Sequence, residues 1–212
     1  KYVFSKIDTQ MCGKRYLWAQ RFLRSNDYGQ TWFTLSEPDS NYTDIDYILN
    51  FADSLHGWRF YTKVLSDSIK TTLKSYIRIF QATSDGGFTW AERNHPDPGN
   101  QINSMFFIDS LYGWVVGNLG YIYRTTDAGF TWDTIRNRNN SYPYYGAPIA
   151  SYFHNDSIGT VFTTNSIART YDKGNHWHQL FVDSAITIRS VDITDRNECV
   201  LSFVQNLPYK GA

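Results

Sequence analysis

An eight-residue motif that occurs four times constrains the fold of this chain more than any other feature of its sequence. The motif reads S/T-x-D-x-G-x-x-W, and the aspartates of successive copies lie 58, 42 and 45 residues apart. Its defining residues are Ser25, Asp27, Gly29 and Trp32; Thr83, Asp85, Gly87 and Trp90; Thr125, Asp127, Gly129 and Trp132; and Thr170, Asp172, Gly174 and Trp177. A period of roughly 40–50 residues is typical of propeller blades. The spacing therefore predicts an all-β fold, a β-propeller of four-stranded blades.

The residue types in this motif suit a tight turn between two strands. An aspartate can accept backbone N–H bonds within such a turn, and a glycine permits a positive φ angle. The Ser or Thr hydroxyl can add a local hydrogen bond, and the Trp can act as an apolar plug between neighbouring blades. We therefore interpret the motif, an Asp box, as a structural device that closes the hairpin between the third and fourth strands of each blade.

A second motif precedes the middle Asp boxes. It reads F-x-D-S-L-x-G-W at 51–58 and at 107–114, with a weaker copy at 153–160. Six of the seven tryptophans lie in the two motifs, which leaves only Trp18 outside them. The large apolar side chains therefore follow the repeat.

The third repeat shows the expected strands most clearly. They cover residues 104–108, 113–117, 121–125 and 130–135, and the Asp box falls on the turn between the last two.

The composition agrees with an ordered β protein. Hydrophobic residues make up 42% of the chain and aromatic residues 17%, and there are 17 Asp but only 3 Glu. Abundant aromatic residues, with few Glu, favour strands and turns over helices. Twenty basic residues balance twenty acidic ones, which argues against a nucleic-acid binder held mainly by phosphate contacts.

Cysteines and long apolar runs are scarce. Cys12 and Cys199 are too few for a disulfide scaffold and lack metal-ligand spacing, so free thiols are expected, with a bridge between them as the alternative. No apolar run approaches the roughly 20 residues that cross a bilayer. The first residues read as a strand without an initiating Met, so we expect a segment of a longer product.

The residues from Phe107 to Trp132 carry a longer pattern, F-x-D-x-x-x-G-W-x-V-G-x-x-G-x-I-x-x-T-x-D-x-G-x-T-W. This pattern resembles the repeat of the photosystem II assembly and stability factor family and related secreted bacterial propellers. The Asp-box hairpins also resemble those of sialidase-type propellers. The first resemblance implies a scaffold for protein–protein assembly in an extracytoplasmic setting: secreted, periplasmic or on the cell surface.

The repeats divide the chain into blades of one domain or of a fragment of one. The predicted repeats are 1–38, 45–97, 101–138, 147–183 and a partial fifth at 186–212. The first is expected to supply all four strands of its blade, and the fifth only strands at 186–193 and 199–205. We expect part of a larger propeller, such as the seven-bladed ring of the resembled family, with a compact five-bladed ring as the alternative.

No set of residues in the sequence indicates catalysis. A sialidase needs an arginine cluster and a Tyr/Glu nucleophile pair, but three glutamates give little material for it, and the related F-R-I-P signature is absent. Other glycosidases need two carboxylates that face each other across a cleft, and no pair stands out. We therefore expect no enzyme, and a carbohydrate-active propeller, either glycan-binding or hydrolytic, is the alternative.

Two segments contain residue types that bind metals in other proteins. His176 and His178 flank a Trp on a strand and would share a face, but no third ligand is evident. Residues 39–50 resemble the opening of a calcium loop but lack its Gly and its closing Glu. Neither pattern predicts a metal site, and the sequence predicts no cofactor.

Two insertions interrupt the repeats. One, around residues 66–75, lengthens the connection between the second and third strands of the second repeat. The other, at 136–146, is rich in Arg and Tyr, which are favoured at recognition surfaces. The candidate partner-binding residues in it are Arg136, Arg138, Tyr142, Tyr144 and Tyr145. The alternative interpretation is a solvated connecting loop.

These observations predict a non-enzymatic binding or assembly scaffold. Its expected partner is another protein or the remaining blades of the same protein, with a glycan as the alternative and no nucleic acid.

Overall fold

The computed structural model describes residues 2–9, 17–25, 27, 29–36, 43–64, 76–97, 99, 101–136, 147–193 and 198–205. Within these residues the chain forms antiparallel sheets and one short 3-10 helix, η2 (Asn118–Gly120). No helix among them is long and apolar enough to cross a membrane. The all-β prediction is confirmed.

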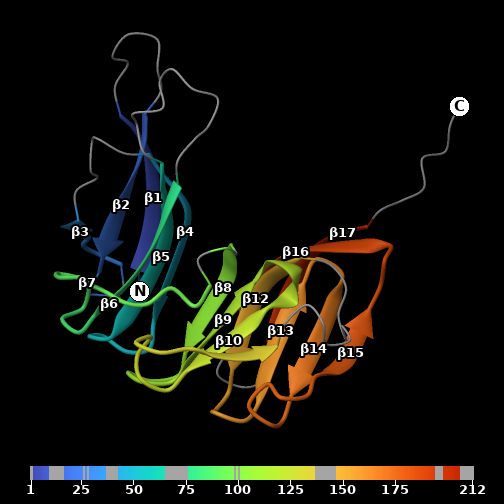
Figure 1. Cartoon of the computed structure of the whole chain (residues 1–212). Helices are drawn as coiled ribbons and strands as arrows, with labels where there is room; N and C mark the ends of the chain where they lie inside the picture. The colour runs from blue at the N-terminus through green and yellow to red at the C-terminus, as the bar shows by residue number, and fades with distance from the viewer. Residues whose placement is uncertain are drawn as a thin grey trace, which may run out of the picture. The chain divides into compact units, whose positions relative to one another are not determined.

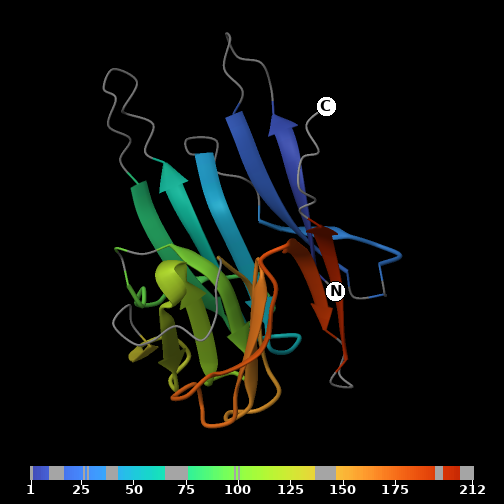
Figure 2. The same ribbon diagram turned by 90° about the vertical axis from the view of Figure 1, so that its right-hand side faces the viewer.

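Strands that follow one another in sequence pair with one another, and each group forms its own sheet (Figures 1 and 2). The first sheet contains β1 (Tyr2–Thr9), β2 (Leu17–Arg24) and β3 (Phe33–Ser36), and the second β4 (Thr43–Phe51), β5 (Gly57–Val64), β6 (Tyr76–Thr83) and β7 (Ala91–Glu92). The third contains β8 (Ile102–Phe107), β9 (Gly113–Gly117), β10 (Ile122–Thr125) and β11 (Asp133–Arg136). The fourth contains β12 (Pro148–Phe153), β13 (Gly159–Thr163), β14 (Ser166–Thr170) and β15 (His178–Val182), and the last β16 (Ile186–Ile193) and β17 (Cys199–Gln205).

Three sheets have the four meandering strands expected of propeller blades, and each Asp box lies on the turn before the last strand. The predicted hairpin position is therefore confirmed. The fourth strand of the third repeat begins at Asp133, three residues later than predicted. The delay arises because the residues up to Trp132 are held in the turn of the Asp box.

The first repeat differs from the prediction of four strands. Its described residues form three, because β1 pairs with β2 along its whole length, from Tyr2 opposite Arg24 to Thr9 opposite Leu17. Strand β2 leads directly into the first Asp box, so β1 and β2 occupy the second and third places of a blade.

The chain separates into two compact units. One comprises Lys1–Leu49 and Ser54–Arg93, and the other Asn50–Asp53 and Asn94–Ala212. The first has its core on β5 and β6, where Trp58, Phe60 and Phe80 are buried. The single domain and the repeat boundaries predicted from the sequence stay predictions.

In the second unit, the sheets β8–β11 and β12–β15 pack through a buried apolar layer. The Trp114 ring stacks on the Phe153 ring, with centroids 3.8 Å apart and planes 9° apart. The other members of this layer are Val116, Ile122, Val161 and Ala168. Stacked aromatic pairs add about 0.5–1.5 kcal/mol to the stabilisation gained by burial, so this layer is a main source of stability for the unit.

The spacing of Phe and Gly in the second motif has a steric cause. Phe107 lies opposite Gly113, and Phe153 lies opposite Gly159, where each pair joins the first two strands of a blade. A Cβ atom on either glycine would lie 2.3 Å from the facing ring. The ring therefore covers the glycine, and no larger residue fits without displacing it.

Candidate functional site

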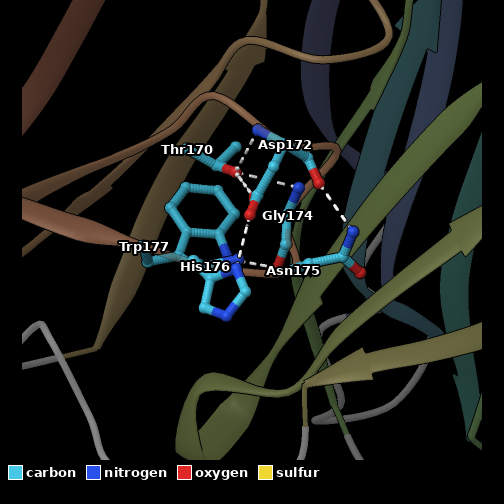
Figure 3. Close-up of polar contacts among 6 residues, drawn as sticks. All are labelled: Thr170, Asp172, Gly174, Asn175, His176 and Trp177. Carbon is cyan, nitrogen blue, oxygen red and sulfur yellow. Dashed lines mark hydrogen bonds and ion pairs between the residues drawn. The ribbon is translucent and has the colours of Figure 1, made fainter.

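The fourth Asp box shows how the repeated motif is built (Figure 3). The Thr170 hydroxyl donates to Oδ1 of Asp172 at 2.9 Å and accepts the N–H of Gly174 at 2.9 Å. The His176 N–H donates to the same Asp172 oxygen at 2.8 Å, and Gly174 has φ +91°. Trp177 closes the turn by donating its ring N–H to the Gly174 carbonyl at 2.8 Å.

The other three boxes repeat this pattern. In each, the Ser or Thr hydroxyl donates to the aspartate and accepts the glycine N–H. A threonine four residues after the aspartate (Thr31, Thr89 or Thr131) donates its hydroxyl to Oδ2 at 2.5–2.6 Å. In the fourth box His176 takes this place, with Nδ1 2.5 Å from Oδ2 of Asp172.

These bonds hold the box carboxylates in the ionised form. The hydroxyl and N–H of Thr31 lower the pKa of Asp27 to about 2, and those of Thr89 do the same for Asp85. For Asp127 and Asp172, burial raises the pKa, but the hydrogen bonds outweigh it and the pKa lies below its usual value. Carboxylates held this way are poor general acids, in keeping with the interpretation of the boxes as structural devices.

The box tryptophans lie at the rim of the core. The Trp132 ring meets Phe107 edge-on at 6.3 Å, and Trp177 meets Phe153 in the same way at 6.3 Å. The fully buried tryptophans are Trp58 and Trp114, which lie near the start of the second strands of their blades. Each box Trp has to reach its turn carbonyl or a neighbouring loop with its N–H, which keeps it partly exposed.

A groove of about 270 Å³ opens in the second unit between the β12–β15 sheet and the β16–β17 pair. One wall comes from β12, β13, β14 and the turns at their ends, and the other from the ends of β16 and β17. The lining residues are Tyr152, His154, Ile158, Thr160, Phe162, Arg169, Tyr171, Ile193, Glu198 and Cys199. Aromatic walls around a few polar groups are typical of ligand sites.

Arg169 is the cation of this groove. Its Nε donates to the Thr160 hydroxyl at 3.2 Å, its one polar side-chain partner in the described part of the chain. The equivalent residue of the third repeat, Arg124, instead forms an ion pair with Asp133 at 3.3 Å. Both arginines face the first residue of the next strand, which is Asp133 in one blade and His178 in the other. With a histidine in place of the acid, Arg169 forms no ion pair of this kind among the described residues.

The aromatic residues of the groove are fixed to different extents. The Tyr152 ring packs against Phe106 with centroids 4.9 Å apart. Tyr171 is more than half exposed and lies 5.9 Å from the His178 ring. Cys199 is an exposed free thiol at the groove edge. A ligand would therefore meet one anchored ring, one open ring and a cation.

Among the predicted partner-binding residues, the structure describes only Arg136, which does not line this groove. Arg136 ends β11, whereas Arg138, Tyr142, Tyr144 and Tyr145 lie outside the described residues, as do the insertion 66–75 and Cys12. The binding role of the 136–146 segment therefore stays a prediction.

The structure describes both histidines and part of the calcium-like segment predicted from the sequence. His176 bonds to its own Asp box, and His178 contacts Tyr171. Of the calcium-like segment, residues 43–50 are part of the extended strand β4, and 39–42 lie outside the described residues. Within the described ranges, no three His, Cys, Asp or Glu side chains gather as metal ligands.

The meander sheets and Asp-box hairpins together define an Asp-box β-propeller architecture. A family model described as photosynthesis system II assembly factor YCF48 matches residues 39–201. The chain belongs to this family.

Relatives and solved structures agree with that assignment. The photosystem II assembly lipoprotein Ycf48 of Synechococcus sp. (strain CC9902) is 22% identical over 147 residues, which cover 68% of this chain and 39% of that protein. A structure of YCF48 bound to D1 peptide superposes with a TM-score of 0.55 at 22% identity, covering 78% of this chain and 52% of that one. The GH74 xyloglucanase of Xanthomonas campestris has a TM-score of 0.58 at 15% identity, covering 98% of this chain and 36% of that one. The matches thus span about half or less of each longer protein, and the structural likeness shows the fold alone.

Proposed function

We propose that this chain is a non-enzymatic propeller scaffold that binds a peptide segment of a protein partner in the groove beside the fourth Asp box. The observation that carries the proposal is Arg169, which lines the groove with several aromatic residues and, among the described residues, has no acidic hydrogen-bond partner like that of its counterpart Arg124. A guanidinium forms bidentate, charge-assisted hydrogen bonds with carboxylates. Tyr152 and Phe162 would pack against the side chains of the bound peptide.

The family relationship supports a peptide as the ligand. One similar structure is titled YCF48 bound to D1 peptide, and the similar Synechococcus protein is named a photosystem II assembly lipoprotein. We extend peptide capture during assembly to this chain, together with an extracytoplasmic location, in keeping with the lipoprotein name of that relative. The partner protein need not be a photosystem subunit, because the groove chemistry fits any extended peptide with an acidic group.

Glycoside hydrolysis is the competing function, and the likeness to a GH74 xyloglucanase favours testing it. A glycosidase needs two carboxyl groups across its cleft. Among the lining residues that the structure describes, Glu198 is the single acidic side chain. We therefore expect incubation with xyloglucan to release no reducing sugar above a protein-free blank, and steady release would contradict the non-enzymatic proposal.

Peptide binding is tested directly by fluorescence anisotropy with a labelled D1 peptide, the class of ligand in the similar YCF48 complex. Removal of one charged hydrogen-bonding partner costs about 1.5–3 kcal/mol, so Arg169→Gln is expected to weaken binding at least tenfold. Arg124→Gln is the matched control, because its guanidinium is paired with Asp133 in the neighbouring blade. This control should bind like the unmodified chain.

Two results would contradict the proposal. The unmodified chain could fail to bind the peptide, or both arginine variants could bind it equally well. Loss of binding in Arg138→Ala/Tyr144→Ala, with Arg169→Gln unaffected, would move the site to the 136–146 segment predicted from the sequence.

A further inference from the structure

The third and fourth repeats are joined by an aromatic stack whose two positions are defined by strand pairing. Trp114 stacks on Phe153, and both side chains are fully buried. Trp114 is the second residue of β9 and lies opposite Arg124 of β10. Phe153 is the last residue of β12 and pairs with Gly159, the first residue of β13. The same two positions can therefore be located at the next junction, between the fourth repeat and β16–β17.

Thr160 takes the place of Trp114 at that next junction. It is the second residue of β13, and it lies opposite Arg169, as Trp114 lies opposite Arg124. Its hydroxyl accepts the Nε–H of Arg169 at 3.2 Å, and its side chain lines the groove. A small polar side chain thus stands where the preceding junction has an indole ring.

Ile193 takes the place of Phe153. It is the last residue of β16 and pairs with Cys199, the first residue of β17, as Phe153 pairs with Gly159. Ile193 also lines the groove, together with Thr160. Both rings of the stack are therefore replaced by smaller, non-aromatic side chains.

The groove lies where these rings are missing. Phe162 is larger than Val116, its counterpart in the third repeat, yet a groove of about 270 Å³ remains beside it. An apolar cavity of about 150 Å³ is enough to hold benzene, so the groove has room for a larger ring. The Tyr152 ring, which packs against Phe106, lines the groove and offers an aromatic surface for stacking.

We propose that the groove binds an aromatic side chain of the captured peptide, tryptophan above all, in the place that the Trp114 ring has at the preceding junction. Arg169 binds an acidic group of the same peptide, so the preferred ligand carries an acidic residue close to an aromatic one. This inference rests on the proposed peptide-binding function and specifies the side chains that the groove recognises.

Fluorescence anisotropy with three labelled peptides tests this preference on the unmodified chain. Each peptide carries one aspartate and, beside it, a tryptophan, a leucine or an alanine. The alanine peptide is expected to bind about tenfold more weakly than the tryptophan peptide, because it lacks the apolar surface that the groove would bury. The leucine peptide should bind about threefold more weakly than the tryptophan peptide, because it has no ring to stack.

Thr160→Trp makes this junction like the preceding one. The introduced ring is expected to fill the groove, so the tryptophan peptide should lose its advantage over the alanine peptide. Thr160→Val is the matched control, because it removes the hydroxyl that holds Arg169 without adding a ring. This control should keep the preference for tryptophan, even if all three peptides bind it more weakly. Circular dichroism checks that both variants are folded.

The possible results separate this inference from the proposed function. Equal affinity of the unmodified chain for the tryptophan and alanine peptides, or for the tryptophan and leucine peptides, would overturn the inference and leave peptide capture standing. A folded Thr160→Trp variant that keeps the preference for tryptophan would also overturn it. No binding of any of the three peptides would contradict the proposed function, and this inference with it.

Discussion

The third and fourth repeats have the same strand order and the same Asp box, yet their outer strands differ in chemistry. In the third, Arg124 is paired with Asp133, and the box is completed by a threonine. In the fourth, Arg169 faces His178 across the strands and lines a groove, and His176 completes the box. The comparison teaches that the same box can close the hairpin while the residue just after it decides whether the neighbouring arginine forms an ion pair.

The largest expected effect comes from the layer that the two blades share. Trp114→Ala removes a fully buried ring that stacks on Phe153. Large-to-small changes of this kind cost about 3–5 kcal/mol. Urea denaturation should show this loss in the free energy of unfolding, and a loss below about 1 kcal/mol would mean that the blades do not depend on the stack.

The covered glycines give a smaller effect that should be equal in the two blades. Gly113→Ala and Gly159→Ala each place a methyl group 2.3 Å from a phenylalanine ring. Overpacking costs about 1–3 kcal/mol, so each variant should lower the melting temperature by a similar amount in calorimetry. If one of the two variants kept the melting temperature of the unmodified chain, the two blades would not be equivalent at this position.

His178→Asp makes the fourth repeat like the third. The new acid would lie opposite Arg169 and pair with it, as Asp133 pairs with Arg124. We expect peptide affinity to fall about tenfold, or about 1.4 kcal/mol, with little change in stability. Unchanged affinity in the anisotropy assay would show that peptide binding does not depend on an Arg169 guanidinium without an ion pair.

The smallest effect concerns acid. The folded-state pKa of Asp85 is about 2, below its ordinary value of 3.8. A lowered folded-state pKa contributes stability above the unfolded pKa, and this contribution is lost as the pH falls from about 4 to about 2. Urea titrations across this window should show stability falling with pH, less steeply for Asp85→Asn. An identical slope for the variant would assign the acid sensitivity to other groups.

Short-range patterns in the sequence were sufficient to predict the Asp-box hairpins and the central strands. Turn chemistry acts within eight residues, and the strands 113–117, 186–193 and 199–205 were predicted with their observed bounds. The first repeat was predicted to supply four strands, whereas its described residues form three. Strand β1 pairs with β2 so that Tyr2 lies opposite Arg24, and no local motif in the sequence indicates this register.

The groove was not predicted, because it depends on which residues face each other across strands. A signal was present all the same: an Arg precedes the box Thr at both Arg124 and Arg169, whereas the residue after the box Trp changes from Asp133 to His178. Only the register of β14 against β15 shows that this change removes the partner of Arg169. The sequence did not distinguish the fully buried Trp58 and Trp114 from the partly exposed box tryptophans, because burial depends on how the sheets pack.

Hydrogen exchange with and without bound D1 peptide tests the central claim, that the fourth repeat carries the binding groove, most directly. The account predicts slower exchange on peptide binding in the strands that line the groove, at 152–162 and 167–171, with no change in the corresponding strands 113–117 and 122–125 of the third repeat. Protection confined to 137–146, or equal protection of both repeats, would contradict it.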